Sequence, residues 1–242
     1  MRKTVEINSF AMGIRDGLPI CFGYFSVSFA FGIFAVGLGL SVWEATLISM
    51  LNLTSAGQFA GTPIIAGGGS FFELGLTQLV INLRYSLMSV SLSQRLGKSV
   101  KFRDRFLISF ANTDEIFAVS VSKNCMVGKT YFHGLMITPY LGWSLGTLLG
   151  AVLGSVLPAF IISALGVAIY AMFVAILVPP AKSDLKVAFA IIFAIALSCV
   201  FYYIPTLSKI PSGFVIIIVA VAVSLAFAAL FPVSDGEVAD NE

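Results

Sequence analysis

Charge is scarce in this sequence. Only 11% of its 242 residues are Asp, Glu, Lys or Arg, whereas 58% are hydrophobic. A soluble domain carries about 25% charged residues, so a folded chain with so few charges could not cover a surface that faces water. Lipid must therefore surround most of its length, which allows one integral domain of about seven spans at roughly 20 residues each. The net charge of +2 indicates neither a nucleic-acid partner nor an acidic substrate.

Residues that bind metals or act as nucleophiles and bases are also few. His133 is the single histidine, and Cys21, Cys125 and Cys199 lie far apart, with no CxxC or Cys/His spacing among them. This pattern predicts no metal site. HExxH, DDxxD and P-loop patterns are absent. We therefore expect no cofactor and no enzymatic activity.

The chain reads as one transmembrane domain over residues 1–242, with an N-terminal segment at 1–17 and an acidic tail at 235–242. The first uncharged run, Leu18–Leu40, is not followed by an A-x-A cleavage pattern, so we expect a retained span rather than a signal peptide. Other apolar runs occupy 74–94, 131–157, 159–178, 187–208 and 210–234. The sequence thus predicts an all-α, multi-pass helical bundle in a membrane.

Two further runs, 45–72 and 106–121, are interrupted by polar residues, and the first also contains glycine and proline, which weaken a helix in lipid. The first is expected to be either a broken or re-entrant helix or a simple span with a polar face. The second has about 16 residues and barely spans. It is expected to be a half-helix pair or an angled helix facing the interior, unless its acidic residues lie in a cytoplasmic loop.

The loop at 95–105 fixes an orientation because it is rich in positive charge. It holds Arg95, Lys98, Lys101, Arg103 and Arg105. Such a loop should be cytoplasmic. Three apolar runs precede it, so either the N-terminus lies outside or one run is re-entrant, with 45–72 as the candidate.

A weak internal similarity relates the two halves of the chain. At an offset of 116, Tyr24 matches Tyr140 and Ser28 matches Ser144. Transporters are often built from inverted repeats that meet at the substrate site. An inverted repeat is therefore a possible feature of this fold.

Polar groups inside membrane segments are costly and indicate function. One group surrounds the interruption of the second run, where a broken helix would direct partly positive backbone N–H groups at a substrate carboxylate. Interhelical hydrogen bonding is the alternative. The candidate substrate-binding residues of this group are Asn52, Thr54, Ser55, Gly57 and Gln58.

A second group, Asn82, Arg84 and Tyr85, lies in the third run. Arginine stays charged and binds a carboxylate through two parallel hydrogen bonds, so all three residues are candidate substrate contacts. The alternatives for Arg84 are a structural ion pair with Asp114 or Glu115 and an extended side chain that reaches the interface.

A third group contains Asn112, a further candidate substrate contact, and the adjacent carboxylates Asp114 and Glu115. A carboxylate in a membrane cavity suits proton coupling or ammonium binding. Neighbouring helix positions are about 100° apart, so we expect at most one of the two to face the same cavity as Arg84.

Glycine recurs at every fourth position of one span, at Gly142, Gly146, Gly150 and Gly154. Successive positions are rotated by about 40°, so they form a slowly winding groove that another helix can approach closely. Either a helix of this chain or a partner subunit would fill this predicted helix-packing groove.

These residues resemble the AzlC family, the large subunit of bacterial branched-chain amino acid exporters. The resemblance covers roughly residues 10–180 and is carried by Arg15–Pro19, Thr54–Ala60, Asn82–Arg84, Leu87–Ser89 and Thr113–Ala118. It departs at Tyr85, where many relatives carry histidine.

The resemblance implies a secondary, proton-coupled exporter of leucine, isoleucine, valine and methionine that works by alternating access. It also implies a small membrane partner of the AzlD type and a location in the bacterial inner membrane. The residues themselves leave open two other readings, a channel or passive pore for small polar solutes and a structural membrane subunit.

Overall fold

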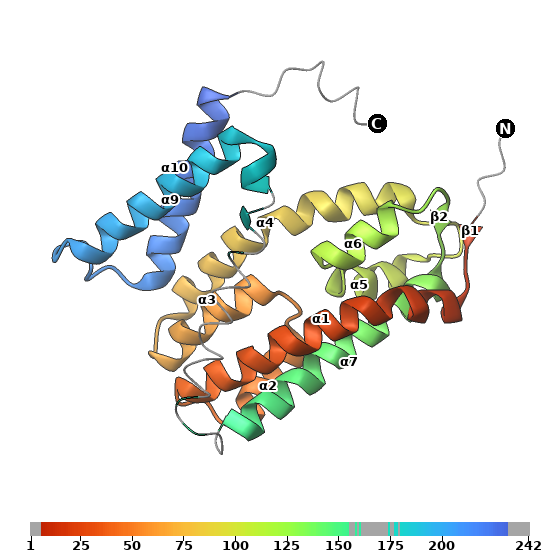
Figure 1. Ribbon diagram of the computed structural model, residues 1–242. Coiled ribbons are helices and arrows are strands. Elements are labelled where there is room, and N and C mark those ends of the chain that lie inside the picture. The colour runs from red at the N-terminus through yellow and green to blue at the C-terminus, as the bar shows by residue number, and fades with distance from the viewer. Residues whose placement is uncertain are drawn as a thin grey trace.

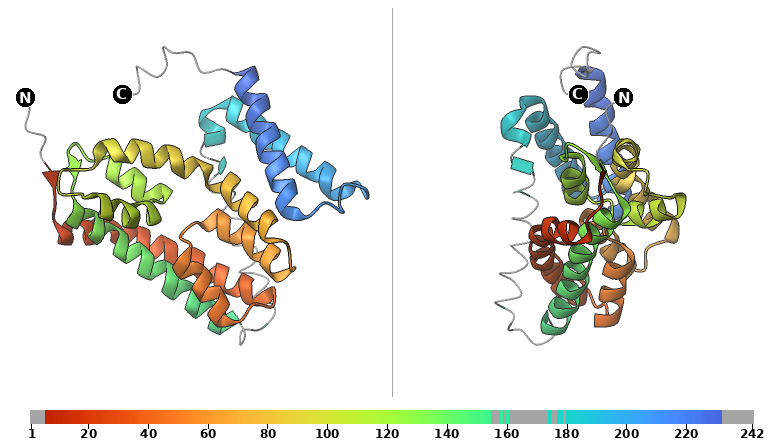
Figure 2. Two further views of the ribbon diagram at one scale, coloured as in Figure 1. Left: turned by 180° about the vertical axis from the view of Figure 1, so that it is seen from behind. Right: turned by 90° about the vertical axis from the view of Figure 1, so that its right-hand side faces the viewer.

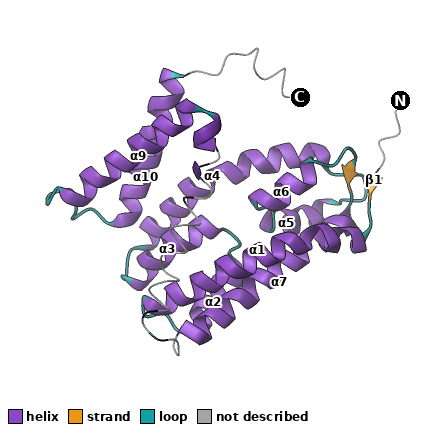
Figure 3. Cartoon of the chain, in the orientation of Figure 1, coloured by secondary structure: helices purple, strands orange, loops and turns teal. Residues whose placement is uncertain are grey.

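The computed structural model describes residues 6–154, 158, 160, 174, 177–178 and 180–231. Helices make up nearly all of this part of the chain, which confirms the expected all-α membrane bundle (Figure 1, Figure 3). In chain order the elements are β1 (Glu6–Ile7), α1 (Phe10–Gly37), α2 (Val42–Leu51), α3 (Ser55–Ala66), α4 (Phe71–Arg95), α5 (Phe102–Phe110), α6 (Asp114–Val121), β2 (Met126–Val127), α7 (Lys129–Gly154), α9 (Leu185–Tyr203) and α10 (Ser212–Leu230).

Four of the described helices, α1, α7, α9 and α10, are long and apolar enough to cross a membrane. Helix α4 is also long enough to cross, at 25 residues and 1.5 Å per residue, although it carries Glu73 and Arg84. The run predicted at 159–178 and the tail at 235–242 lie almost entirely outside the described residues. The chain is therefore built from long crossing helices and several shorter ones.

Helices α1 and α7 lie side by side and run in the same direction (Figure 2). A methyl group added at Gly134 would overlap the backbone of Phe10, and one added at Gly150 would overlap that of Phe29. From Gly142 to Gly154 the glycines face α1 at successive turns, from Cys21 to Ile33. A helix of this chain, rather than a partner subunit, therefore fills the groove.

The second run is broken and re-entrant. Helix α2 runs antiparallel to α7, because Met50 O accepts the Tyr140 hydroxyl at 3.2 Å whereas the earlier Ser49 contacts Thr147 at 2.7 Å. The chain leaves helical geometry at Asn52–Thr54. Helix α3 then runs back toward the end of the bundle at which α2 begins. There Ile65 of α3 lines the same cavity as Leu40, which precedes α2.

The third and fourth runs repeat this arrangement in the opposite direction, as a long helix, α4, followed by a hairpin of two short helices, α5 and α6. Helix α4 carries the chain back to the N-terminal end, where Leu96 pairs with Val127 and β1 pairs in parallel with β2. Helix α5 enters the bundle, the chain breaks at 111–113, and α6 returns until Lys123 pairs with Asp16 of α1 at 2.7 Å. The half-helix pair is thus a second re-entrant hairpin.

These directions, together with the positive charges, predict an orientation in the membrane. Only α1 and α4 cross before the basic loop, so that loop and β1 lie at the same end. From residue 6 to 129, every lysine and arginine except Arg84 lies at this end, whereas Lys209 precedes Gly213, which bonds Glu73 at the other end. The excess of positive charge predicts that the end with the basic loop is cytoplasmic. Glu44 and Glu73 lie at the opposite end, beside the turns that follow α1 and α3.

An inverted relation is present within the first half of the chain. The unit α1–α2–α3 and the unit α4–α5–α6 each consist of a long helix followed by a broken hairpin, and they run in opposite directions. The offset of 116 instead pairs α1 with α7, and because these two helices are parallel they are not inverted copies of each other.

Helices α9 and α10 form a pair that contacts α4 through α10 (Figure 1). The Gly213 backbone N–H of α10 donates to the Glu73 carboxylate at 3.0 Å. A carboxylate at a helix N-terminus is stabilised by the free N–H groups there. Glu73 therefore fastens the start of α10 to the first turn of α4.

Candidate solute-binding site

The tips of the two re-entrant hairpins meet at one cavity of about 700 Å³, hereafter the central cavity. Its size falls within the roughly 300–1,000 Å³ of small-molecule sites. The lining comprises Pro19, Ile20, Gly23, Tyr24 and Val27 of α1, Leu53, Ser55 and Ala56 of the first hairpin, Ile81, Arg84 and Tyr85 of α4, Thr113, Asp114 and Glu115 of the second hairpin, and Trp143 of α7.

Both returning half-helices begin at this cavity. Thr54 caps α3 by accepting the Gly57 N–H at 3.0 Å, and Thr113 caps α6 by accepting the Ile116 N–H at 3.5 Å. Because each helix runs away from the cavity, its partly positive N-terminus is directed toward it. This arrangement favours a negatively charged group in the cavity.

Arg84 and Asp114 form an ion pair in the cavity wall, with 2.8 Å between Nη2 and Oδ2. Their side chains are 52% and 45% exposed, so both still face open space. The Arg84 guanidinium also lies over the Tyr85 ring, 5.1 Å from its centroid. The Arg84 side chain therefore does not extend toward a membrane surface. Its guanidinium lies beside the Asp114 carboxylate in the middle of the bundle.

Both carboxylates of α6 line the central cavity, so the expectation that only one would face it is wrong. Glu115 accepts the Tyr24 hydroxyl at 2.5 Å, while Asp114 pairs with Arg84. The two residues occupy the first turn of α6, at the tip of a hairpin, so the cavity reaches around two sides of the helix end. Two carboxylates and one guanidinium give the site one surplus acid.

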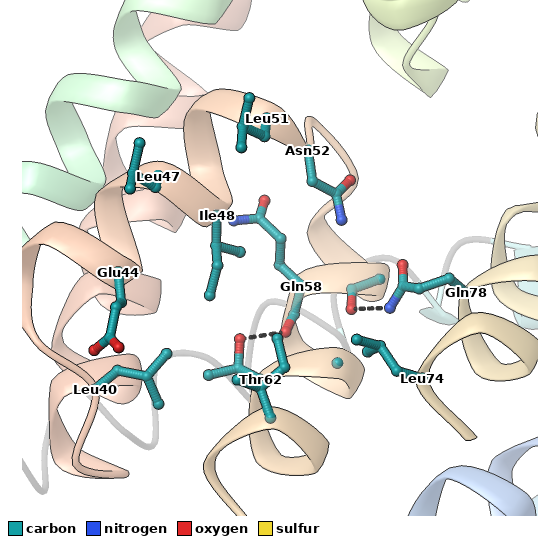
Figure 4. Close-up of a pocket in the computed structure, with 13 residues that line it drawn as sticks. Leu40, Glu44, Leu47, Ile48, Leu51, Asn52, Gln58, Thr62, Leu74 and Gln78 are labelled. Carbon is teal, nitrogen blue, oxygen red and sulfur yellow. Dashed lines mark hydrogen bonds between the residues drawn. The ribbon is translucent and has the colours of Figure 1, made fainter. Parts of the chain in front are cut away.

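Part of the first candidate group lies elsewhere. Asn52, Gly57 and Gln58 line a second cavity of about 430 Å³ between α2, α3 and α4 (Figure 4). The Gln58 side chain is buried and accepts from Trp143 Nε1 at 2.8 Å while donating to Ser49 Oγ at 2.7 Å. For Gln58 the structure therefore shows the interhelical hydrogen bonding that was the alternative to substrate contact.

The remaining candidates hold the hairpins in place. Asn82 Nδ2 donates to Gln78 Oε1 at 3.2 Å, and Gln78 Nε2 donates to the Gly57 carbonyl at 2.8 Å. Asn112 Nδ2 donates to Ser89 Oγ at 3.1 Å beside a small hollow of about 90 Å³. Of the predicted contacts, the structure brings together Ser55, Arg84, Tyr85, Asp114 and Glu115 in the central cavity.

Sequence reasoning missed two aromatic walls of the central cavity. Tyr24 and Trp143 contact each other edge to face, with 5.2 Å between ring centroids. Both are buried, and both use their polar atoms in hydrogen bonds to residues of the hairpins. A tyrosine and a tryptophan deep within apolar spans, away from the interfaces where such residues usually gather, could have signalled them.

The segment Gly142–Gly146 fits the GxSxG pattern of serine hydrolases, with Ser144 at the nucleophile position. That chemistry requires a sharp strand-to-helix turn, whereas Ser144 lies inside α7. His133, the single histidine, is eleven residues earlier on the same helix, about 16 Å along its axis. The glycines of this segment serve helix packing instead.

Comparisons with known proteins find one matching family and two similar membrane proteins. Residues 19–157 match the family described as "AzlC protein". The "Inner membrane protein YgaZ" of Escherichia coli (strain K12) is 32% identical over 144 residues, which cover 58% of this chain and 59% of that protein. An "Uncharacterized membrane protein" of Archaeoglobus fulgidus is 35% identical over 177 residues, 72% of this chain and 76% of that protein. No solved structure matches the chain.

Proposed function

Because this chain belongs to the AzlC family of multi-pass inner-membrane proteins, we propose that it is the large subunit of a branched-chain amino acid exporter. Its solutes are leucine, isoleucine, valine and methionine. It works by alternating access, with proton coupling, together with a small membrane partner of the AzlD type. The observation that carries this proposal is the central cavity, where opposite charges and apolar walls surround one space.

The chemistry of a branched-chain amino acid matches that space. Its carboxylate needs donors, which Arg84 and the starts of α3 and α6 supply. Its ammonium group needs an acceptor, which Asp114 supplies. Its aliphatic side chain needs an apolar surface, which Ile20, Val27, Leu53 and Ile81 supply. Few other small solutes require all three at once.

The Arg84–Asp114 pair explains how the protein can keep two charged side chains in the wall of an empty cavity. Unpaired charges in a low-dielectric site are costly, and the two residues neutralise each other at 2.8 Å. A zwitterion can insert its carboxylate at Arg84 and its ammonium at Asp114, so that both residues keep a partner. A solute with only one charge would leave one residue unpaired, which favours zwitterions over amines and acids.

The surplus carboxylate supports proton coupling. By the family resemblance, Tyr85 stands where histidine is expected, and a phenol ordinarily titrates near pH 10. Tyr85 therefore does not replace histidine as a proton carrier at neutral pH. In this chain the coupling proton is assigned to the Asp114 and Glu115 carboxylates, both of which line the central cavity.

The test is efflux of leucine and valine from preloaded cells that express this chain with or without the small partner. We expect faster efflux when both chains are expressed. Efflux should continue when the amino acid concentration is higher outside the cells than inside, and it should stop when the proton gradient is dissipated. Equal rates in the presence and absence of both well-expressed chains would remove the substrate assignment. Efflux that only follows the solute gradient would instead indicate a passive pore.

A further inference from the structure

The central cavity and the second cavity are separated by a single turn of chain. Leu53, Ser55 and Ala56 line the central cavity, whereas Asn52, Gly57 and Gln58 line the second (Figure 4). Since neighbouring residues of one turn face opposite cavities, the tip of the α2–α3 hairpin is the partition between them.

The partition is held by hydrogen bonds that cross from one cavity wall to the other. Trp143, a wall of the central cavity, donates to Gln58, a wall of the second, and Gln58 in turn donates to Ser49 of α2. Ser49 also contacts Thr147 of α7 at 2.7 Å. All four side chains are buried, so this chain of bonds ties α2, α3 and α7 together at the partition.

On its other side the partition contacts α4 through side-chain amides. Gln78 donates to the Gly57 carbonyl, and Asn82 donates to Gln78. The buried Asn82 Oδ1 has no hydrogen-bond partner among the residues that the structure describes. Because amides carry both donors and acceptors, they can exchange one hydrogen-bond partner for another. The partition is therefore fastened by exchangeable polar contacts on both sides.

The second cavity lies on the extracytoplasmic side of the partition. It is bounded by Leu40 and Glu44 near the turn after α1 and by Ile65 near the turn after α3, which is the end opposite the basic loop. Leu47 and Leu74 give it aliphatic walls, and its polar lining residues are Glu44, Asn52, Gln58, Thr62 and Gln78. This mixture suits a small polar solute with an aliphatic side chain.

We propose that the Asn52–Gln58 turn is the extracytoplasmic gate of the translocation path, and that the second cavity is the vestibule that receives an aliphatic amino acid after it passes Gln58. The proposal rests on the transport function proposed above and assigns its exit route. Breaking the Trp143–Gln58 bond frees the hairpin tip, and the two cavities become continuous.

The test is labelling of single cysteines in intact cells with a charged, membrane-impermeant thiosulfonate, after Cys21, Cys125 and Cys199 have been replaced by alanine. Leu74→Cys probes the vestibule and Ala56→Cys probes the central cavity. Leu83→Cys, an exposed position of α4 that is not among the residues lining either cavity, is the control for lipid exposure. The assay needs no solute, so its outcome is independent of the efflux result.

We expect rapid labelling at Leu74→Cys, little at Leu83→Cys and slow labelling at Ala56→Cys. Adding Gln58→Ala should speed labelling at Ala56→Cys about tenfold, the effect of one lost buried hydrogen bond on a two-state equilibrium. Trp143→Phe removes only the donor and should act in the same direction, in case Gln58→Ala folds poorly. Asn112→Ala, which removes a hydrogen bond at the other hairpin, should leave the rate unchanged.

Three outcomes would overturn the proposal. Absence of labelling at Leu74→Cys would mean that lipid rather than water fills the second cavity. An unchanged rate at Ala56→Cys in both gate variants would mean that the turn is not a gate. An equal increase with Asn112→Ala would mean that the whole bundle had loosened.

Discussion

At the scale of single residues, the Arg84–Asp114 pair can be a binding site or only a structural contact, and a charge swap separates the two. In the double variant Arg84→Asp with Asp114→Arg the opposite charges face each other again. A purely structural pair should regain function in the double variant. Binding should not recover, because the carboxylate of the solute must lie near the starts of α3 and α6 as well as near Arg84.

We therefore predict that Arg84→Asp and Asp114→Arg each abolish leucine efflux and that the double variant regains folding without regaining transport. The measurements are the amount of protein that elutes as a single species in detergent and the efflux rate in cells. Each single variant places two like charges side by side in the cavity wall, so the single variants should also express less well. Efflux in the double variant close to that of the unchanged protein would contradict the binding role.

At the same scale, the sequence predicted which residues are polar and within the membrane but not which cavity each one faces. Arg84, Asp114 and Ser55 lie where a solute site was expected. Gln58 lies three residues after Ser55 and belongs to a hydrogen-bonded network instead. A shift of less than one helical turn therefore separates a residue that lines the central cavity from one that joins the network. Composition carries no information about the rotation of the helix, which determines the direction in which each side chain points.

At the scale of elements, the contact between α1 and α7 depends on glycine. A methyl group at Gly150 would overlap backbone atoms of Phe29, which cannot rotate away. We predict that Gly150→Ala destabilises the protein by about 1–3 kcal/mol, the usual cost of overpacking. Thermal unfolding in detergent should show it as a Tm lower by about 2–4 °C for each kcal/mol.

The matched control is Gly75→Ala in α4, where the added methyl group meets no atom within 4 Å. Alanine is favoured over glycine inside a helix by about 1 kcal/mol, so this variant should keep or raise the Tm. Equal Tm values for Gly150→Ala and Gly75→Ala would show that the close approach of α1 and α7 is not needed.

Element boundaries followed local sequence where caps and breaks decide them. The interruptions at Asn52–Thr54 and Ala111–Thr113 lie within the two runs whose polar residues predicted them. The start of α1 differs, because the helix begins at Phe10 rather than at Leu18. Its charged first turns are stabilised by a distant partner, since Asp16 pairs with Lys123 and accepts the Tyr131 hydroxyl. Such tertiary contacts cannot be read from local composition.

At the scale of the whole molecule, the re-entrant hairpins predict an unusual accessibility pattern. The turns before α2 and after α3 lie at the same end, so Leu38→Cys and Phe71→Cys should both react with an impermeant reagent outside intact cells. Both positions are exposed. Lys98→Cys and Ser122→Cys, at the two ends of the second hairpin, should react only after the cells are permeabilised. If Leu38→Cys and Phe71→Cys reacted from opposite sides, residues 45–72 would be a full span.

The same scale shows why the overall arrangement was only partly predictable. Hydropathy located the long helices, and positive charge oriented the loop at 95–105. The inverted relation between α1–α2–α3 and α4–α5–α6 leaves little trace in sequence, because two helices of small and apolar residues resemble each other by composition alone. Direction had to come from contacts such as Lys123–Asp16 and Tyr140–Met50.

The central claim is that the central cavity binds a zwitterion with an aliphatic side chain. The most direct measurement is radiolabelled leucine counterflow in proteoliposomes that contain this chain and its small partner, with and without Arg84→Gln. The account predicts counterflow that unlabelled valine competes for, that neither 3-methylbutylamine nor 4-methylpentanoate competes for, and that Arg84→Gln abolishes. Competition by the amine or the acid as strong as by valine, or undiminished counterflow in Arg84→Gln, would contradict it.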